Sequence, residues 1–116
     1  MKAKFVEKEW GYEIWMANNE KEDYCGKILR INAGCKTSMH YHMDKHETFY
    51  VREGQLQVSL IDTEQGKERH HMVLEDCTFE IERGQPHQLS AYGGHDVEFI
   101  EISTLHKDSD SKRISR

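Results

Sequence analysis

Two histidines and a glutamate near the middle of the chain have a spacing that suits metal binding. His40 and His42 are separated by one residue, and Glu47 follows His42 by five positions. In two short strands joined by a tight connection, residues of one parity share a face. The two imidazoles then point the same way, and the carboxylate meets them from the next strand. Such a set suits a divalent transition metal that keeps positions open for a substrate.

Short runs of strand-forming residues surround this stretch, separated by turn residues such as Gly, Asn and Asp. We expect strands over 10–15, 24–31, 39–43, 47–52, 56–61, 71–74, 78–81, 87–91 and 97–103. Residues 17–23 and 62–69 are polar and are expected to form turns or loops. About nine short strands with a turn roughly every eight to twelve residues predict an all-β sandwich or barrel, and a jelly roll fits the strand number.

The size and composition of the chain favour one soluble domain. The 116 residues are enough for one domain with one modest core. We expect the core barrel over about 8–104, followed by a docked or frayed tail over 105–116. Hydrophobic residues make up 36%, charged residues 32%, and the net charge is −5, which lacks the positive excess of a nucleic-acid binder. No apolar run reaches membrane-spanning length, and the N-terminus lacks a signal-peptide pattern. We therefore expect a cytoplasmic protein.

The three cysteines do not indicate a disulfide framework. Cys25, Cys35 and Cys77 are odd in number and widely spaced, so we expect free and mostly buried thiols. Cys35 lies close to the histidine stretch in sequence, which leaves a redox or crosslinking role open for this one residue.

The histidine stretch resembles the first motif of the cupin superfamily. That motif is Gly, five residues, His-x-His, three or four residues, Glu, six residues, Gly. Here Gly34, His40, His42, Glu47 and Gly54 fill every position. The resemblance implies a double-stranded β-helix, the cupin-type jelly-roll barrel, with a metal held by this motif.

The second cupin motif is matched in part. Gly84 and His87 lie where the motif has Gly and the third histidine ligand, so the resemblance implies His87 as a ligand. Glu75, Glu82 and Ala91 replace the Gly, Pro and Asn that families usually have. The ligand set implied by the two motifs thus has three nitrogens and one oxygen.

Within cupins the chain is most similar to the cupin domain that ends type II mannose-6-phosphate isomerases. The likeness rests on the pair 10–11 (Trp-Gly), on Lys27, on the strand 100–102 (Ile-Glu-Ile), and on the acidic segment that leads to Arg113. That family often has Gln where this chain has His40. The resemblance implies a sugar-phosphate isomerase or epimerase that forms a homodimer.

The implied site contains one divalent metal, with Fe, Mn, Ni, Co and Zn all compatible with the donor set. The expected ligands are His40, His42, Glu47 and His87. Four other histidines have no ligand spacing to the motif and are expected to be solvated or capped: His70, His71, His95 and His106. His46 is expected to point to the opposite face of the strand from Glu47.

Substrate contacts are expected from Lys27 and Phe49, whose parity points into the barrel, and from Arg113 if the tail folds over the mouth. The catalytic base is unassigned. Its candidates include Lys27, Glu82 and Tyr92, besides His46 and Glu101. Trp10 and Trp15 are candidates for a subunit interface.

Two other functions suit the same metal set. Three histidines and a glutamate also serve Fe(II)-dependent dioxygenases, and a non-catalytic sugar- or metabolite-binding module can use the metal as an anchor. The expected partner is a small molecule, a sugar or sugar phosphate, rather than nucleic acid or a membrane. The fold alone does not choose among these functions.

Overall fold

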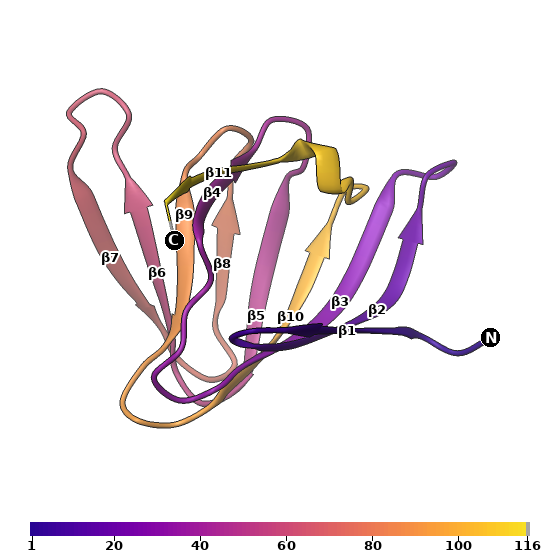
Figure 1. The fold of residues 1–116 in the computed structure, drawn as a ribbon, viewed down its shortest axis with the longest axis horizontal. Helices are drawn as coiled ribbons and strands as arrows, with labels where there is room; N and C mark the ends of the chain where they lie inside the picture. Colours follow the sequence, from indigo (N-terminus) through magenta and orange to yellow (C-terminus); the bar gives the residue numbers. More distant parts are fainter. Residues whose placement is uncertain (116) are drawn as a thin grey trace.

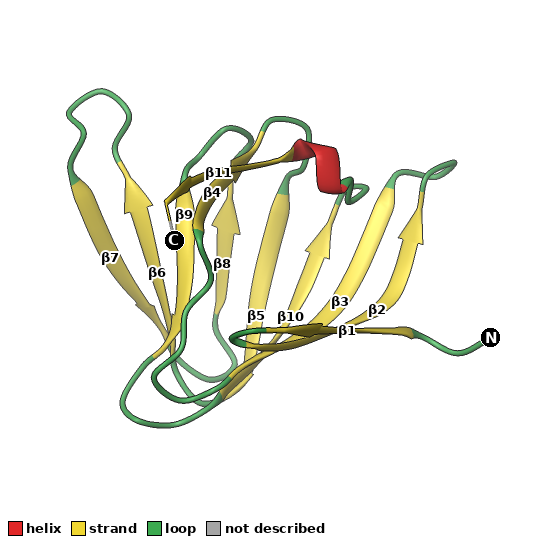
Figure 2. Ribbon diagram, viewed as in Figure 1, coloured by secondary structure: helices red, strands yellow, loops and turns green. Residues whose placement is uncertain are grey.

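The computed structural model describes residues 1–115, which form eleven strands and one short 3-10 turn (Figures 1 and 2). The elements are β1 (Lys4–Lys8), β2 (Gly11–Asn19), β3 (Tyr24–Ile31), β4 (Met39–His42), β5 (Glu47–Glu53), β6 (Leu56–Ile61), β7 (Glu68–Val73), β8 (Thr78–Ile81), β9 (His87–Ala91), β10 (Val97–Ser103), η1 (Asp108–Asp110) and β11 (Ser111–Ser115). Among these described residues, no helix is long and apolar enough to cross a membrane.

The strands form two antiparallel sheets that enclose one core. One sheet has six strands in the order β1-β2-β3-β10-β5-β8, and the other has five in the order β11-β4-β9-β6-β7. Non-consecutive strands such as β3, β10 and β5 are neighbours, which is the pattern of a jelly roll. The all-β jelly-roll barrel expected from the sequence is therefore confirmed.

The core fills the end of the barrel beneath the histidine stretch. Its buried residues are Leu29, Ile31, Phe49, Val51, Leu56, Val58, Val73, Ile81, Leu89, Val97 and Phe99. They occupy alternate positions on strands from both sheets, as expected where two inner faces meet. The rings of Phe49 and Phe99 pack edge to face, with centroids 5.3 Å apart.

Two of the eleven strands are absent from the sequence-based expectation. β1 is mostly exposed and all five residues of β11 are exposed, so neither strand carries the apolar–polar alternation that predicts a half-buried strand. The expected strand 10–15 is also too short. It extends to Asn19, with a bulge between Trp15 and Ala17, because its polar end pairs with the start of β3.

The C-terminal tail is docked on the barrel rather than frayed. β11 pairs with β4, and in this register Ser111 lies opposite His42 and Arg113 opposite His40. Figure 1 shows β11 lying across the end of the barrel beside β4. The buried Asp110 carboxylate accepts hydrogen bonds from the backbone N–H groups of Met43, Asp44 and Lys45 at 2.9 to 3.2 Å. The tail therefore fixes the turn between β4 and β5.

Candidate metal centre

Three histidines from two neighbouring strands converge inside the barrel. His40 and His42 lie on β4, and His87 begins β9 directly opposite His40 in the strand register. One ring nitrogen from each histidine lies within 4.8 Å of those of the other two. This spacing allows all three imidazoles to contact a single cation.

Hydrogen bonds orient two of these rings. The Nδ1 atoms of His40 and His87 lie 2.8 and 2.9 Å from the backbone carbonyl oxygens of Ser38 and Gln85. A carbonyl oxygen only accepts, so each Nδ1 carries the proton and each Nε2 has a free lone pair. A backbone partner of this kind is what orients a metal-ligating histidine.

The histidines of β4 are held in the neutral form that a metal requires. Burial, reinforced by the neighbouring His87, lowers the pKa of His40 from 6.5 to about 4. Burial and the nearby Lys45 ammonium lower the pKa of His42 to about 2. Both rings are therefore neutral near pH 7 and available as nitrogen donors.

Glu47 lies beside the histidines with one buried oxygen that has no hydrogen-bond partner among residues 1–115. Its Oε2 is 3.4 Å from His87 Nε2 and 3.6 Å from His42 Nε2. His42 Nδ1 is likewise buried, and no described residue forms a hydrogen bond with it. A buried carboxylate oxygen without a hydrogen-bond partner is unfavourable unless a cation joins it. The donor set of three nitrogens and one oxygen therefore fits a divalent transition metal.

A buried lysine that sequence reasoning missed lies behind Glu47. Lys45 is 3% exposed, and its Nζ is 3.7 Å from Glu47 Oε1, 3.1 Å from Glu101 Oε2 and 3.0 Å from His106 Nδ1. Burial opposes its charge, but the carboxylates of Glu101 and Glu47 outweigh burial and raise the pKa of Lys45. Lys45 lies between β4 and β5, outside either strand, so strand parity does not predict where its side chain points.

His106 is the second residue whose place differs from the expectation. Instead of being solvated, it lies in the cavity wall, with its ring centroid 6.3 Å from that of His42. Burial lowers its pKa, with a further contribution from the Lys45 charge. Its contact with Lys45 joins residues 61 positions apart, so no local spacing indicates it.

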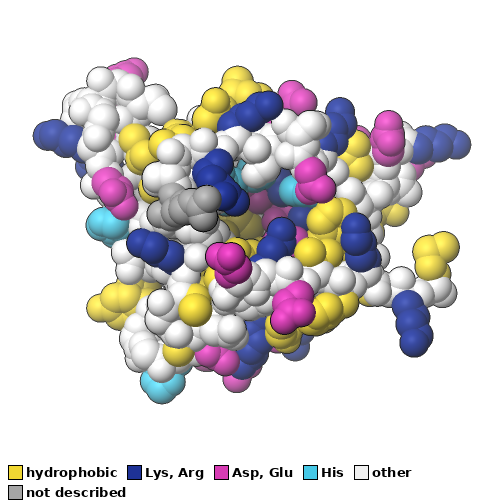
Figure 3. Space-filling view, in the orientation of Figure 1, with side chains coloured by type: hydrophobic (Ala, Val, Ile, Leu, Met, Phe, Trp, Pro, Cys, Tyr) yellow, Lys and Arg dark blue, Asp and Glu magenta, His cyan; other side chains and the backbone are white. Residues whose placement is uncertain are grey.

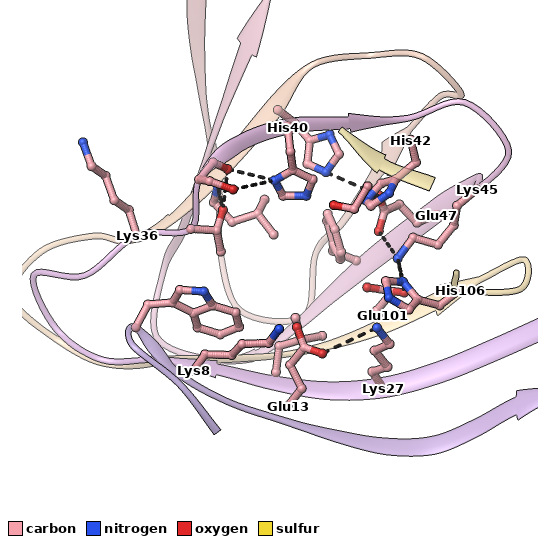
Figure 4. Close-up of a pocket in the computed structure, with 18 of the residues that line it drawn as sticks. Lys8, Glu13, Lys27, Lys36, His40, His42, Lys45, Glu47, Glu101 and His106 are labelled. Atoms are coloured by element: carbon pink, nitrogen blue, oxygen red, sulfur yellow. Dashed lines mark hydrogen bonds and ion pairs between the residues drawn. The ribbon is translucent and has the colours of Figure 1, made fainter. Parts of the chain in front are cut away.

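Lys27 and Glu13 lie on the wall of the six-stranded sheet, away from the histidines (Figure 4). Lys27 is 2% exposed, its Nζ is 3.5 Å from Glu13 Oε1, and it lies 4.2 Å from the centre of the Trp15 ring. The Trp15 indole N–H donates to the same Glu13 oxygen at 2.8 Å. The Lys27 ammonium thus has two partners in the cavity wall, the Glu13 carboxylate and the face of the Trp15 ring.

The cavity between these walls has a volume of about 570 Å³, and residues of both β1 and β11 contribute to its lining. Figure 3 shows the hollow, with acidic and basic side chains inside it. Eight of the residues expected at the site line it: Lys27, His40, His42, Glu47, Phe49, His87, Glu101 and Arg113. A volume of this size is typical of small-molecule sites.

Two expected site residues lie elsewhere. Glu82 is exposed and does not line the cavity. Tyr92 lies in a separate depression with Arg30 and His95. Conversely, Trp10 lines the cavity and Trp15 packs over Lys27, so these tryptophans have partners within the chain rather than serving only an interface. As expected, His46 lies at the surface, where it pairs with Glu80.

Comparison with known proteins is consistent with this architecture. A family model described as "Cupin domain" matches residues 27–103. Among solved structures, the capsular polysaccharide assembling protein CapF of Staphylococcus aureus aligns with a TM-score of 0.86 at 16% identity over 100% of this chain and 33% of its own. Oxalate decarboxylase of Bacillus subtilis aligns with a TM-score of 0.82 at 18% identity over 97% of this chain and 30% of its own.

These likenesses concern the fold, because both identities are low. The chain spans about a third of the length of each of the two proteins. No curated protein sequence matches it.

Proposed function

The chain belongs to the cupin family, and on that basis we propose that it is a metal-dependent isomerase or epimerase acting on a sugar phosphate of the mannose-6-phosphate type. One observation carries the proposal. The histidine cluster shares a single cavity with a carboxylate–ammonium pair, Glu13 and Lys27, that is not committed to the metal. Aldose–ketose interconversion needs both components, a metal and a group that moves a proton.

His40, His42, His87 and Glu47 would hold the ion. When bound, a divalent ion supplies Lewis-acid stabilisation of the negative charge that develops on substrate oxygens. The chain itself must bind the sugar, orient it and move one proton between neighbouring carbons. The resemblance to type II mannose-6-phosphate isomerases supports the substrate class.

We assign the proton transfer to Glu13. Its carboxylate lies in the cavity wall, is held by Trp15, and is paired with Lys27 rather than with a histidine of the cluster. It would take a proton from one carbon of the sugar and return it to the neighbouring carbon, while the hydroxyl proton of the substrate passes from one oxygen to the other. The carboxylate is regenerated at the end of the step. A positioned general base of this kind contributes about 10²–10⁴-fold to a rate.

An anionic substrate is favoured by the cations of the cavity. Lys27 lines the cavity while paired with Glu13, and Lys8 and Arg113 line it from β1 and β11. Figure 4 shows the Lys8 side chain directed toward Glu13, whereas Lys36 points away. Within residues 1–115, no carboxylate forms an ion pair with Lys8 or Arg113. A phosphate group would supply the missing partner.

The test is turnover by metal-loaded protein on a panel of phosphorylated and unphosphorylated aldoses, followed by NMR. We expect exchange between aldose and ketose forms or inversion at one carbon. Glu13→Gln should lower kcat by at least about 100-fold without loss of metal. Glu82→Gln, an exposed carboxylate outside the cavity, is the matched control and should be fully active.

The same experiment separates the other functions. Tight binding of a sugar phosphate without turnover would replace the proposal with a binding module. Oxygen uptake by the Fe(II)-loaded protein with a thiol or polyphenol substrate would replace it with a dioxygenase. Activity that survives in Glu13→Gln would leave the isomerase in place and remove Glu13 from its mechanism.

A further inference from the structure

Lys45 distributes its interactions unevenly among three acceptors. Its Nζ donates to Glu101 Oε2 at 3.1 Å and to His106 Nδ1 at 3.0 Å. The carboxylate of Glu47 is further away, at 3.7 Å, which is an ion-pair distance rather than a hydrogen bond. The two hydrogen bonds therefore hold the ammonium back from Glu47.

This arrangement matters because Glu47 is the only anionic member of the candidate ligand set. An ammonium that moved into hydrogen-bond contact with Glu47 would compete with a cation for the same carboxylate. With Lys45 retained by other acceptors, Glu47 Oε2 faces the histidines and accepts no hydrogen bond from the part of the chain that the structure describes. Metal affinity should thus depend on what retains Lys45.

One of the two retaining groups comes from the C-terminal tail. His106 Nδ1 faces an ammonium, so it must be the acceptor nitrogen, and the proton is on Nε2. Nε2 lies 2.9 Å from Asp108 Oδ1, to which it donates. The acceptor nitrogen of His106 is thereby fixed toward Lys45.

The position of His106 is itself built into the fold. Asn18 at the end of β2 clamps the backbone of His106 by two hydrogen bonds, at 2.9 and 3.0 Å. The ring of Trp15 packs against the imidazole in an edge-on arrangement, with centroids 5.1 Å apart. Two strand residues thus hold a tail histidine at the cavity wall.

We propose that His106 is a positioning residue of the metal centre, which retains the Lys45 ammonium away from Glu47 and so leaves the Glu47 carboxylate available to a divalent cation. The inference rests on the metal centre of the proposed function. It adds to that function a contribution from the tail, which lies outside both cupin motifs.

The experiment measures Co²⁺ binding to the full chain by calorimetry and by the visible absorption of the bound ion. His106→Leu removes the acceptor and should weaken Co²⁺ binding about 10- to 100-fold, the usual effect of altering an outer partner of a metal ligand, and change the absorption spectrum. His106→Asn should restore binding to within about threefold, because its side-chain oxygen can stand where Nδ1 stood. His95→Leu, an exposed histidine in the separate depression, is the matched control and should match wild type.

Urea unfolding of the metal-free variants separates positioning from folding. If His106→Leu lowers stability but leaves the Co²⁺ dissociation constant and spectrum unchanged, the role of His106 is structural and the proposal is overturned. If Asn binds Co²⁺ as poorly as Leu, an acceptor toward Lys45 is not what matters, and the proposal is again overturned. If wild type binds no Co²⁺, Mn²⁺ or Zn²⁺, the metal centre itself fails, which is a distinct result from a variant that binds normally.

Discussion

Replacement of Lys45 by methionine should strongly destabilise the metal-free protein. The Lys45 ammonium lies 3.1 Å from Glu101 and 3.7 Å from Glu47, and the three side chains are 2–4% exposed. Methionine fills a similar volume without charge, so the variant leaves the two carboxylates buried without this cation. An uncompensated buried charge is among the largest single destabilising effects in a protein interior.

The magnitude follows from the ionisation of Glu101. Burial alone would raise its pKa, yet the charges of Lys45 and Lys27 lower the pKa from 4.5 to about 2. Each tenfold change in an ionisation constant corresponds to about 1.4 kcal/mol. The shift therefore contributes about 3 kcal/mol, present in full above pH 4.5 and lost as the pH falls through about 2. Lys45→Met should lose most of this at pH 7.

The assay is urea-induced unfolding of metal-free wild type, Lys45→Met, Glu101→Gln and the double variant at pH 7. Because the pair acts together, the double variant should be less destabilised than the two single effects combined, by about 2 kcal/mol. Lys67→Met, at an exposed loop position, is the control and should change stability by less than about 0.5 kcal/mol. Additive single effects, or a loss below about 1 kcal/mol in Lys45→Met, would refute the reasoning.

Three further predictions concern a turn, the histidines and the outer face of the larger sheet. Gly54→Ala should lower the free energy of unfolding in urea by roughly 1–3 kcal/mol more than Gly66→Ala does. Both glycines have positive φ, at +84° and +68°, so both substitutions strain the backbone. At Gly54, unlike Gly66, the added Cβ would also collide with backbone atoms of Asp96 and Val97. Equal losses would contradict this. The metal-free protein should lose stability as the pH falls below 6.5, because the folded-state pKa of His40 is lowered to about 4 and that of His42 to about 2, while the unfolded chain takes up protons first. Unfolding midpoints that stay constant between neutral pH and about 4.5 would argue against buried neutral imidazoles. The homodimer predicted from the resemblance should be disrupted by Ile102→Lys, since this residue is 62% exposed on the six-stranded sheet. Light scattering after gel filtration measures the mass, and a wild-type mass of 13.7 kDa rather than twice that value would rule the dimer out.

The sequence predicted the barrel because most of its strands have one buried face. β6 is the clearest case, since Leu56 and Val58 alternate with Gln57 and the strand bounds were predicted correctly. The strands that were missed lack this signal. β11 has no buried residue, and it is held to β4 by backbone pairing that any sequence can make. Backbone hydrogen bonds to an existing edge leave no trace in side-chain periodicity.

The candidate site could be predicted where its residues are close in sequence and follow strand parity. His40, His42 and Lys27 were placed inside the barrel on that ground, and the structure puts them at one cavity. Glu82 and Tyr92 were candidates for the base by elimination only, and neither lines this cavity. The residue types indicated that these two side chains could transfer a proton. Their distance from the histidines depends on how the strands pair, which the sequence does not show.

The C-terminal tail contributes to the metal centre from outside the two cupin motifs. Glu47 lies within the first cupin motif, but the group that keeps Lys45 from it, His106, lies outside both motifs. Asp110 in the same segment accepts three backbone N–H groups of the turn that precedes Glu47. The tail thus acts on the turn through its backbone and on Lys45 through a side chain. It follows that two chains with this motif and different tails should differ in their affinity for a divalent cation, even when all four ligand residues are the same.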